Sequence, residues 1–493
     1  MNFWPKNTIV YYMAENLTTF EDLKEVLEAN HHGADLGPVI KAFHFASEAH
    51  RGQKRRTGED YIYHALATAY NLAKMKMDIP TITAGLLHDV PEDTDFTYDD
   101  IKNNFGNEVY YLVKGVTKLG TLKYRGLERY AENLRKMFLF MSKDLRVIII
   151  KLADRLHNME TLEGVRPEKR LRIAHETLDI FAPIANRLGM FRIKTQLEDL
   201  AFPYVYPSEY AWVNELVQDR LKSEAKYIEK IKKIAQKDLA KNDVPFISIK
   251  GRVKSLYSLY QKLLDKSRDI NKIYDLIALR IVVPEVADCY LALGVIHKRW
   301  TPLKGRVKDY IAQPKPNGYQ SLHTSVFTEF GKVAEFQIRS SSMDEEAEYG
   351  VAAHSRYKEI GILGKRKNPP KWLKNLIEIQ KTITDNAEFI KHIKTDFFLN
   401  QIFVFTPKGD VIELPENSTP LDFAYHIHTD IGNQCIGAKV NDHIVSLDTA
   451  LKSGDLIEII TNKARKYPNP DWLNIVATNL AKNKIRSQLK TKN

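Results

Sequence analysis

The pattern of hydrophobic and polar residues changes character part-way along this chain of 493 residues. From about residue 36 to residue 200, apolar residues recur at spacings of three and four, as in VIKAFHFASEAH and TLDIFAPIANRLG, which predicts amphipathic helices. The stretch VNELVQDRLKSEAKYIEKIKKIAQKDLAK predicts a long charged helix that begins at Val213. The first half of the chain is therefore expected to be mainly α-helical.

After Pro245 the pattern favours strands mixed with helices. ISIKGRVKSLYSLYQKLL, DLIALRIVVPE and KVAEFQIR contain β-branched and aromatic strand-like runs, so residues 240 to 360 are predicted to form an α/β or α+β domain. GKRKNPP is a basic, proline-ended linker candidate. Beyond it, QIFVFTPKGDVIELPENSTPLDFAYHIH predicts a hairpin turned by Pro407 to Asp410 and then a short helix, and LKSGDLIEIIT predicts a closing strand. This order is typical of a small β-grasp module at about 400 to 462.

Composition narrows the class of protein. A hydrophobic content of 44% with 27% charged residues is typical of folded domains and not of disorder. The net charge of +11 favours polyanionic partners such as nucleotides, RNA or an anionic membrane surface. Cys289 and Cys435 are far apart and form no CxxC, which excludes a disulfide framework and fits a reducing cytoplasm. No segment has the pattern of a secretory signal or a membrane span, so a cytoplasmic protein is expected.

Polar residues interrupt the helical pattern in the stretch LLHDVPEDT. A continuous helix would place His88 near Glu92 and Asp89 near Asp93, because residues four apart are neighbours on a helix. Pro91 predicts a kink or a restart of the helix at this point. An isolated His-Asp dipeptide is usually just a polar part of the protein surface. Whether His88 and Asp89 form a metal site therefore depends on further possible ligands elsewhere in the sequence.

Such partners are present. His64 in YIYHAL and Asp154 in KLADRLHN lie within apolar helical patterns, where an unpaired polar group is costly. With His88 and Asp89 they make a donor set suited to manganese, iron or zinc. A cation of this kind lowers the pKa of a bound water, so the predicted reaction is metal-assisted phosphoester hydrolysis with a nearby carboxylate relaying protons. The residues suited to phosphate and base contacts around this set are Arg55, Arg56, Thr57, Asn158 and Thr161.

A second constellation lies in the mixed domain. Its basic and aromatic members are Arg252, Lys254, Lys262, Arg306, Lys308, Lys315, Tyr319 and His323. A solvated basic surface is the alternative explanation, but Asp275 and Glu335 belong to strand-like segments among these cations, and such a carboxylate pair suits magnesium that also binds substrate phosphates. The sequence leaves open whether Tyr319 stacks on a purine or packs in the core.

Together these segments resemble the long Rel/SpoT-homologue family, bifunctional enzymes of the stringent response that make and hydrolyse the alarmone (p)ppGpp. The resemblance runs from AHRGQKRRTGEDYIYH through LLHDVPEDT, RVIIIKLADRLHNMETL, GRVKSLYSLYQK, YDLIALRI and GRVKDYIAQPKPNGYQSLHT to GDLIEIIT. The fold class that it implies is multidomain, with an all-α HD-type hydrolase domain, an α/β nucleotidyltransferase-like synthetase domain and a small β-grasp (TGS) domain. The expected segments are 1–200 for the hydrolase, 201–240 for a helical connector, 241–360 for the synthetase, 361–399 for a linker, 400–462 for the TGS domain and 463–493 for the start of a helical region.

The resemblance implies roles for the first set of residues. His64, His88, Asp89 and Asp154 would hold Mn²⁺, and Glu92 and Asp93 would serve as the acid/base and water-orienting pair. The residues that would hold the alarmone are Arg55, Arg56, Thr57, Asn158 and Thr161.

For the second set, the family transfers pyrophosphate from ATP to the 3′-hydroxyl of GDP or GTP. Asp275 and Glu335 would bind Mg²⁺, with Glu335 as the candidate base, and Tyr319, beside Asn317, would stack on guanine. Arg252 and Arg280 would flank the adenine. The residues that would serve the phosphates are Lys254, Ser258, Lys262, Arg306, Lys308, Lys315 and His323.

Other features follow from the same resemblance. RVKD at Arg306 to Asp309 is similar to the basic variant found in bifunctional members. His428 would contact the acceptor end of uncharged tRNA on the ribosome. The family usually continues into further helical, zinc-binding or cysteine-rich and ACT domains, which this sequence lacks, and the two activities are expected to be reciprocally regulated. The sequence departs from the usual pattern at five positions. Ala65 and Val253 stand where proline is usual, Pro91 where valine is usual, Arg56 where lysine is usual and Thr57 where serine is usual.

Two alternatives belong to different functional classes. One is a tRNA- or ribosome-binding regulator whose catalytic domains have decayed, which the loss of Asp275, Glu335 or the HD ligands would favour; all are present. The other is a (p)ppGpp hydrolase alone, with the synthetase domain retained as a nucleotide sensor.

Overall fold

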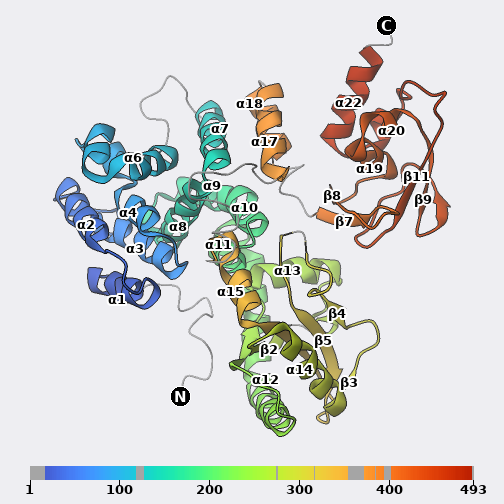
Figure 1. Cartoon of the computed structure of the whole chain (residues 1–493), viewed down its shortest axis with the longest axis horizontal. Helices are drawn as coiled ribbons and strands as arrows, with labels where there is room; N and C mark the ends of the chain where they lie inside the picture. The colour runs from blue at the N-terminus through green and yellow to red at the C-terminus, as the bar shows by residue number, and fades with distance from the viewer. Residues whose placement is uncertain are drawn as a thin grey trace. The chain divides into compact units, whose positions relative to one another are not determined.

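A computed structural model describes residues 17–117, 127–273, 276–315, 317–353, 371–383, 385–393 and 401–490. The chain divides into two compact units, residues 1–123 with 132–369, and residues 124–131 with 370–493. Figure 1 shows helices in the N-terminal part of the chain, a mixed sheet with helices in the middle, and strands with short helices near the C-terminus. The predicted fold class, all-α followed by α/β and a small β-rich domain, is confirmed.

The helical part of the first unit is built around one buried helix. Every residue of α4 (Ile79–Leu87) from Thr81 to Leu87 is buried, and α2, α3, α6 and α8 pack around it. The bounds of the helices from the start of the described chain to α8 are α1 Phe20–Asn30, α2 Gly37–Ala49, α3 Ile62–Lys74, α5 Val90–Asp93, α6 Tyr98–Val116, α7 Leu127–Lys143 and α8 Arg146–Glu160.

The chain turns sharply after α4. The helix ends at Leu87, and α5 begins at Val90 with Pro91 in its first turn. The restart predicted at Pro91 is confirmed, because proline lacks the N–H that an uninterrupted helix would need and is tolerated in a first turn. The break places His88 and Asp89 in the corner between two helices.

A run of helices links this part to the sheet. The elements are η2 (Leu162–Gly164), α9 (Pro167–Glu176), a π-helical turn η3 (Thr177–Phe181), α10 (Ala182–Arg187), α11 (Phe191–Val205) and α12 (Pro207–Lys241). The long helix α12 starts at Pro207, six residues before the predicted Val213. A proline at the first helical position is favourable, since its φ angle already suits a helix.

The mixed sheet separates a hydrophobic core from a polar face. Its strands follow the order β1-β2-β6-β5-β3, with β4 also paired to β5, and only β2 and β6 run parallel. Side chains alternate between the two faces. On one face Ile249, Leu279, Ile281, Phe336 and Ile338 join the core cluster that includes residues of α12, α13 and α14. The bounds are β1 Ser248–Val253, α13 Leu256–Asp265, η4 Ile270–Lys272, β2 Ile277–Val283, α14 Val286–Arg299, β3 Thr301–Pro302, β4 Lys308–Asp309, β5 Leu322–Phe327 and β6 Val333–Ser340.

Helix α15 (Ser341–Tyr349) connects the sheet to α11. It contacts β2 and β6 on one side and α11 on the other. At its end, Gly350 of η5 (Gly350–Ala352) adopts φ 57°, and a Cβ there would lie 2.2 Å from the carbonyl oxygen of Leu188. Only glycine fits this approach, so the helical and mixed parts of the unit meet here through backbone.

The second unit contains the β-grasp module. The hairpin predicted around Pro407 to Asp410 is confirmed by antiparallel pairing of β7 (Gln401–Phe405) with β8 (Val411–Pro415). The region expected as a linker contains two helices, α17 (Lys371–Thr382) and α18 (Asn386–His392), while GKRKNPP lies outside the described residues. The remaining elements are α19 Pro420–Ile427, α20 Thr429–Asn433, β9 Cys435–Val440, β10 His443–Val445, β11 Ile457–Thr461, α21 Trp472–Ile475 and α22 Asn479–Lys490.

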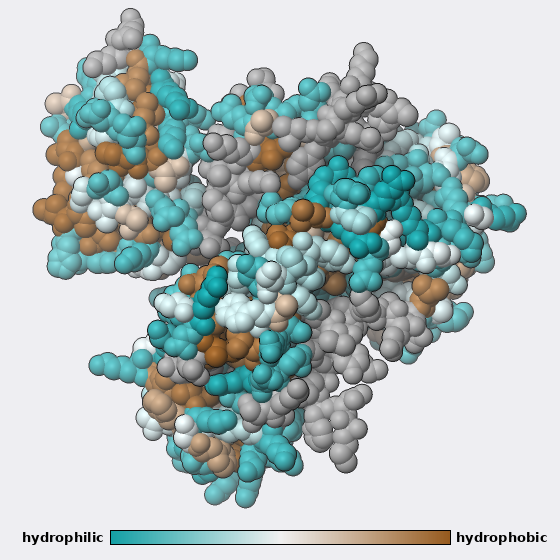
Figure 2. Space-filling model, turned by 180° about the vertical axis from the view of Figure 1, so that it is seen from behind, coloured by the Kyte–Doolittle hydropathy of each residue, from teal (hydrophilic) through white to brown (hydrophobic). Residues whose placement is uncertain are grey.

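The surface is mixed in polarity. On the face shown in Figure 2, hydrophilic residues separate several hydrophobic patches. Among the described helices, none combines the length and the hydropathy that a membrane crossing requires.

Candidate active sites

Four predicted ligands meet at the corner after α4. Three of them are almost completely buried: His64 of α3 is 2% exposed, His88 is 1% exposed, and Asp154, which belongs to α8, is 4% exposed. The ligand atoms of these three residues lie within 4.8 Å of one another. Asp89 joins them, with its Oδ2 3.4 Å from the Nε2 of His64 and 3.2 Å from the Nε2 of His88. The structure therefore brings the predicted imidazoles and carboxylates into one buried cluster.

Hydrogen bonds set the tautomers of both histidines. The Nδ1 of His88 donates to the carbonyl of Gly85 at 2.8 Å. The Nδ1 of His157 faces an Arg55 N–H at 2.9 Å, and since guanidinium can only donate, this nitrogen accepts. It also lies 2.8 Å from the Nδ1 of His64, which must then carry a proton. The Nε2 atoms of both rings are left facing the cluster, the arrangement that metal-binding histidines adopt.

The buried donors fit a divalent cation. The Nε2 of His88 is buried and makes no hydrogen bond of normal geometry. Lys151 donates to the Oδ2 of Asp154 at 2.7 Å, and Asn158 donates to its Oδ1, so the carboxylate is held with Oδ1 toward the histidines. Neutral imidazoles with carboxylates are ligands for manganese, iron or zinc, so an ion of this class fits the cluster.

The charges in the cluster reinforce one another. Burial alone would lower the pKa of His88, but the neighbouring carboxylates of Asp89 and Asp154 raise it to about 10. Burial opposes ionisation of Asp89 and Asp154, yet the adjacent cationic groups hold both pKa values well below their usual range. Burial, with the nearby charges of His64 and Arg55, lowers the pKa of His157 to about 2 and keeps that ring neutral.

Tyr61 connects the cluster to the predicted acid/base pair. Its hydroxyl oxygen lies 2.8 Å from the Oδ2 of Asp89 and 2.9 Å from the Oδ2 of Asp93, so its single proton is shared between the two carboxylates. Its ring stacks on His50, with centroids 4.6 Å apart. Asp93 is therefore fixed beside the metal-ligand candidates, and Glu92 lies next to it, half-buried, in α5.

The residues predicted to hold a phosphorylated ligand lie along one side of this cluster. Arg55 donates to Asn158 at 2.9 Å as well as to His157. Thr57 packs against Gly164, beyond the end of α8, and Arg56 beside it is exposed. Thr161 donates to the carbonyl of His157 at 2.9 Å. The structure thus brings Arg55 and Asn158 to the metal cluster and leaves Arg56 at the surface.

The second constellation lies on the polar face of the sheet. Arg252 donates to the Oε1 of Gln337 at 2.8 Å, and Gln337 donates to Glu335 at 3.1 Å. His323 lies 3.5 Å from Glu335 through its Nδ1 and 2.8 Å from the hydroxyl of Tyr319 through its Nε2. Asp275 lies outside the described residues, so the predicted pairing of Asp275 with Glu335 stays a prediction.

Cations surround this row of residues. Lys308 lies opposite His323 in the register of β4 and β5. The ammonium of Lys315 lies 4.7 Å from the ring centroid of Tyr310 and 5.1 Å from that of Tyr319. The pKa of Lys315 is lowered to about 8. The main cause is desolvation of its ammonium group, although part of the side chain is exposed, and the second is repulsion by the charges of Lys308, Lys194, Lys254 and Arg252. Repelling cations of this kind favour a polyanionic ligand.

Other predicted residues have more varied surroundings. Arg280 forms ion pairs with Glu348 at 2.7 Å and Asp344 at 3.5 Å, so α15 engages it. Ser258 and Lys262 lie in successive turns of α13, Lys254 just precedes that helix, and Arg306 is exposed before β4. In the second unit, His428 precedes α20 with 65% of its side chain exposed, and its Nδ1 accepts from the backbone of Asp430.

Helix α11 forms a wall of the second constellation. Phe191 contacts Tyr319 edge-on, with ring centroids 5.3 Å apart, and Tyr319 is 9% exposed. Asp199 accepts a hydrogen bond at 3.0 Å from the backbone N–H of Tyr257 in the first turn of α13. Lys194 pairs with Glu198 at 2.8 Å. The last helices of the all-α part therefore help to shape the sheet's polar face.

Comparisons with known proteins agree with this arrangement. Over 477 residues the chain is 46% identical to the guanosine-3′,5′-bis(diphosphate) 3′-pyrophosphohydrolase of Aquifex aeolicus, covering 95% of this chain and 67% of that protein. The chain belongs to the RelA/SpoT family. It is also 45% identical to the bifunctional (p)ppGpp synthase/hydrolase SpoT of Escherichia coli and 44% identical to a GTP pyrophosphokinase of Myxococcus xanthus, covering 96% of this chain in both cases.

The domain families follow the chain in the expected order. An HD domain matches residues 42–191, a region found in RelA/SpoT proteins matches residues 251–361, and a TGS domain matches residues 402–461. The chain spans 67% of the length of the Escherichia coli relative and 63% of that from Myxococcus xanthus.

Several site residues of this RelA/SpoT protein escaped sequence reasoning. Lys151 stands three residues before Asp154, a spacing that signals contact within a helix and was available in KLAD. Gln337 stands two residues after Glu335, a spacing that places both on one face of a strand and was available in AEFQ. Tyr61 and His157 carry no comparable signal, because their partners are distant in the sequence. His157 was nevertheless adjacent to a predicted residue, Asn158.

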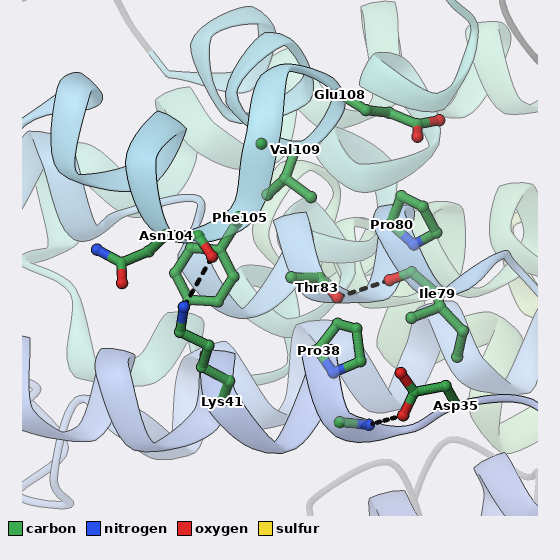
Figure 3. A pocket seen from close by; sticks show the side chains of 12 residues that line it. Asp35, Pro38, Lys41, Ile79, Pro80, Thr83, Asn104, Phe105, Glu108 and Val109 are labelled. Atoms are coloured by element: carbon green, nitrogen blue, oxygen red, sulfur yellow. Dashed lines mark hydrogen bonds between the residues drawn. The ribbon is translucent and has the colours of Figure 1, made fainter.

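A separate pocket of about 520 Å³ lies at the other end of α4, where Ile79, Pro80 and Thr83 line it. Figure 3 shows Lys41 reaching the backbone of Asn104, to which its ammonium donates at 2.8 Å. The remaining charged groups at its wall are Asp35 and Glu108. No residue of either predicted site lines this pocket.

Proposed function

We propose that this chain is a cytoplasmic, bifunctional enzyme that makes (p)ppGpp at one site and hydrolyses it at another. The observation that carries the proposal is the presence, in one chain, of a buried two-histidine, two-carboxylate cluster and a separate sheet face with a carboxylate among cations. The names of the relatives, which include both a synthase/hydrolase and a pyrophosphokinase, support it.

At the hydrolase site, His64, His88, Asp89 and Asp154 would hold Mn²⁺. When bound, such an ion lowers the pKa of a coordinated water and offsets charge on the scissile phosphate. Glu92 and Asp93 would orient the attacking water and move its proton, with Asp93 held by Tyr61. The 3′-pyrophosphate would be released, leaving GDP or GTP.

Recognition of the alarmone would use the neighbouring groups. Arg55 lies at the edge of the cluster and supplies a planar set of donors that suits phosphate oxygens. Arg56, Thr57, Asn158 and Thr161 would complete the contacts to phosphate, ribose and base.

At the synthetase site, Glu335 would accept the proton of the 3′-hydroxyl as its oxygen attacks the β-phosphorus of ATP. The bond between the α- and β-phosphates would break, so that the β- and γ-phosphoryl groups are transferred together as pyrophosphate and AMP leaves. Asp275 and Glu335 would hold Mg²⁺, which offsets the charge of the phosphates when bound. Arg252 and Arg280 would flank adenine, and Tyr319, next to Asn317, would stack on guanine. The residues that would engage phosphates are Lys254, Ser258, Lys262, Arg306, Lys308, Lys315 and His323.

The TGS domain gives the chain a further candidate partner. His428 is exposed, and because its Nδ1 is engaged by Asp430, its Nε2 edge is the one available for recognition. Contact of His428 with the acceptor end of uncharged tRNA on the ribosome is part of the proposal.

A hydrolase whose synthetase domain only senses nucleotides is the second candidate function. The observation that favours it is the burial of Tyr319, which is 9% exposed and packs against Phe191 with ring centroids 5.3 Å apart. A Tyr319 ring packed against protein neighbours is the alternative to one that stacks on guanine.

One experiment separates these functions. The purified protein is incubated with ATP, GDP and Mg²⁺, and separately with ppGpp and Mn²⁺, and the nucleotides are resolved by chromatography. The proposal expects ppGpp in the first reaction and GDP with pyrophosphate in the second. Hydrolysis without any synthesis would establish the sensor alternative. If neither reaction occurs, the tRNA- or ribosome-binding regulator is the remaining function.

A further inference from the structure

Five side chains form a continuous row across the polar face of the sheet, from Arg252 through Gln337, Glu335 and His323 to Tyr319. The links measure 2.8 Å, 3.1 Å, 3.5 Å and 2.8 Å in that order. The row joins the residue proposed for adenine to the residue proposed for guanine, with the proposed base in the middle.

The strand register explains why these residues meet. Gln337 lies directly opposite His323 in the antiparallel pair β5·β6, and Glu335 is two residues before Gln337 on the same strand. Arg252 lies opposite Ala278, which in turn lies opposite Glu335. Since side chains two apart and side chains directly opposite share a face, all of them project toward the same side.

Glu335 needs support in this position. It is a carboxylate whose Oε1 accepts from Gln337 and faces the Nδ1 of His323, so two neighbours on different strands hold the same oxygen. Gln337 is 7% exposed, and its amide is fixed because Arg252 can only donate and therefore takes the amide oxygen. The amide nitrogen must then point at Glu335.

The Tyr319 hydroxyl is connected to Glu335 by way of a hydrogen bond to His323. The hydroxyl lies 2.8 Å from the Nε2 of His323, whose other nitrogen faces Glu335. The ring of Tyr319 contacts Phe191 and Lys315, and its centroid lies 5.8 Å from that of the His323 ring. A change to the hydroxyl therefore reaches Glu335 through His323 and leaves the ring's own contacts in place.

We propose that Gln337 and His323 are positioning residues that hold the Glu335 carboxylate for synthesis, and that the Tyr319 hydroxyl acts through His323. This assignment rests on the proposed synthetase function and adds to it a residue, Gln337, and a division of labour within Tyr319. Each positioning residue contacts one of the proposed nucleotide-binding residues. Gln337 contacts Arg252, which is proposed for adenine, and His323 contacts Tyr319, which is proposed for guanine.

The decisive variant is Tyr319→Phe, which keeps the ring and removes the hydroxyl. We expect the kcat of synthesis to fall about tenfold, the size of losing one hydrogen bond in a charged network, while the KM for GDP stays within about twofold. Tyr310→Phe is the matched control, because the Tyr310 ring lies edge-on to His323 at 5.3 Å and its hydroxyl is no part of the row. Its kcat should equal that of the parent.

Two further variants test the path. In Tyr319→Phe/His323→Gln, the kcat should match that of His323→Gln alone, because the hydroxyl acts on Glu335 through His323. Gln337→Met keeps the volume and removes both hydrogen bonds, so it should lower kcat and raise the KM for ATP, leaving the KM for GDP unchanged. Hydrolysis of ppGpp by each variant reports that the fold is intact.

The outcomes separate this assignment from the proposed function. A parent enzyme without synthesis overturns both. A parent that synthesises, with Tyr319→Phe at the parent kcat or with its loss confined to the KM for GDP, overturns the positioning role alone. Additive losses in the double variant would show that the hydroxyl does not act through His323.

Discussion

At the scale of single residues, the hydrolase cluster depends on groups that touch its ligands. The Tyr61 hydroxyl lies within hydrogen-bond distance of both Asp89 and Asp93, so one phenol orients both a metal ligand and an acid/base candidate. Partners of this kind typically change metal affinity or activity 10- to 100-fold when they are lost. Tyr61 is therefore expected to matter although it carries no metal itself.

Replacing Tyr61 by phenylalanine should lower ppGpp hydrolysis about tenfold and weaken Mn²⁺ binding, since the two carboxylates lose the hydroxyl that they share. The ring stacked on His50 remains, so the fold should survive. Steady-state hydrolysis across a Mn²⁺ titration measures both effects. Tyr63→Phe, two residues along α3, is the control, and equal behaviour of the two variants would remove Tyr61 from the site.

At the scale of elements, α11 links the all-α part to the synthetase sheet. Its Asp199 is 7% exposed and caps the first turn of α13, beside Glu198 and Lys194. Burial raises the pKa of Asp199 to about 7. The negative charge of Glu198 acts in the same direction, and the hydrogen bond from the Tyr257 N–H acts against it. The folded protein therefore keeps a proton there that the unfolded chain releases near its ordinary pKa of 3.8.

This pKa shift predicts a pH-dependent stability. Between about pH 4 and pH 7 the folded state binds more protons at Asp199 than the unfolded state, so the free energy of unfolding falls as the pH rises, by about 4 kcal/mol in total. Asp199→Asn should remove this contribution, and its stability relative to the parent should improve from pH 5 to pH 8. Urea unfolding at both pH values measures the difference, and a constant difference would show that Asp199 is ionised throughout.

A second element-scale prediction concerns the C-terminal helix. Asp422 of α19 is 0% exposed and accepts from the backbone N–H groups of Thr419, Ala477 and Thr478, which ties the start of α22 to α19. Asp422→Ala should cost roughly 3 kcal/mol, because several buried donors lose a charged acceptor. Amide hydrogen exchange in α22 should accelerate in this variant and not in the exposed control Asp448→Ala.

The sequence predicted the elements whose signals are local. Apolar periodicity located the helices, Pro91 located the break after α4, and polar residues inside apolar patterns identified His64 and Asp154. It did not reveal α17 and α18 within the expected linker. Nor did it reveal the link from Gln337 to Arg252 or the contact of Phe191 with Tyr319, because these depend on strand register and on packing between elements distant in sequence. The choice between stacking and core packing for Tyr319 needed that long-range information.

At the scale of the whole molecule, the central claim is that one chain carries two chemically distinct sites. The hydrolase cluster lies among α3, α4 and α8, whereas the synthetase row lies on β1, β5 and β6, with α11 between them in sequence. Making and hydrolysing (p)ppGpp together would only consume ATP, so the two sites are expected to be reciprocally regulated. Because each site has its own ligands, each should be removable without the other.

The most direct test assays both reactions in Asp89→Asn and in Glu335→Gln. The first variant loses a charged metal ligand, so hydrolysis should fall at least about 100-fold while synthesis continues. The second loses the proposed base, so pyrophosphate transfer from labelled ATP should collapse while ppGpp hydrolysis and calorimetric GDP binding persist. Equal loss of both reactions in either folded variant, or transfer near the parent rate in Glu335→Gln, would contradict two separate sites with these residues at their centres.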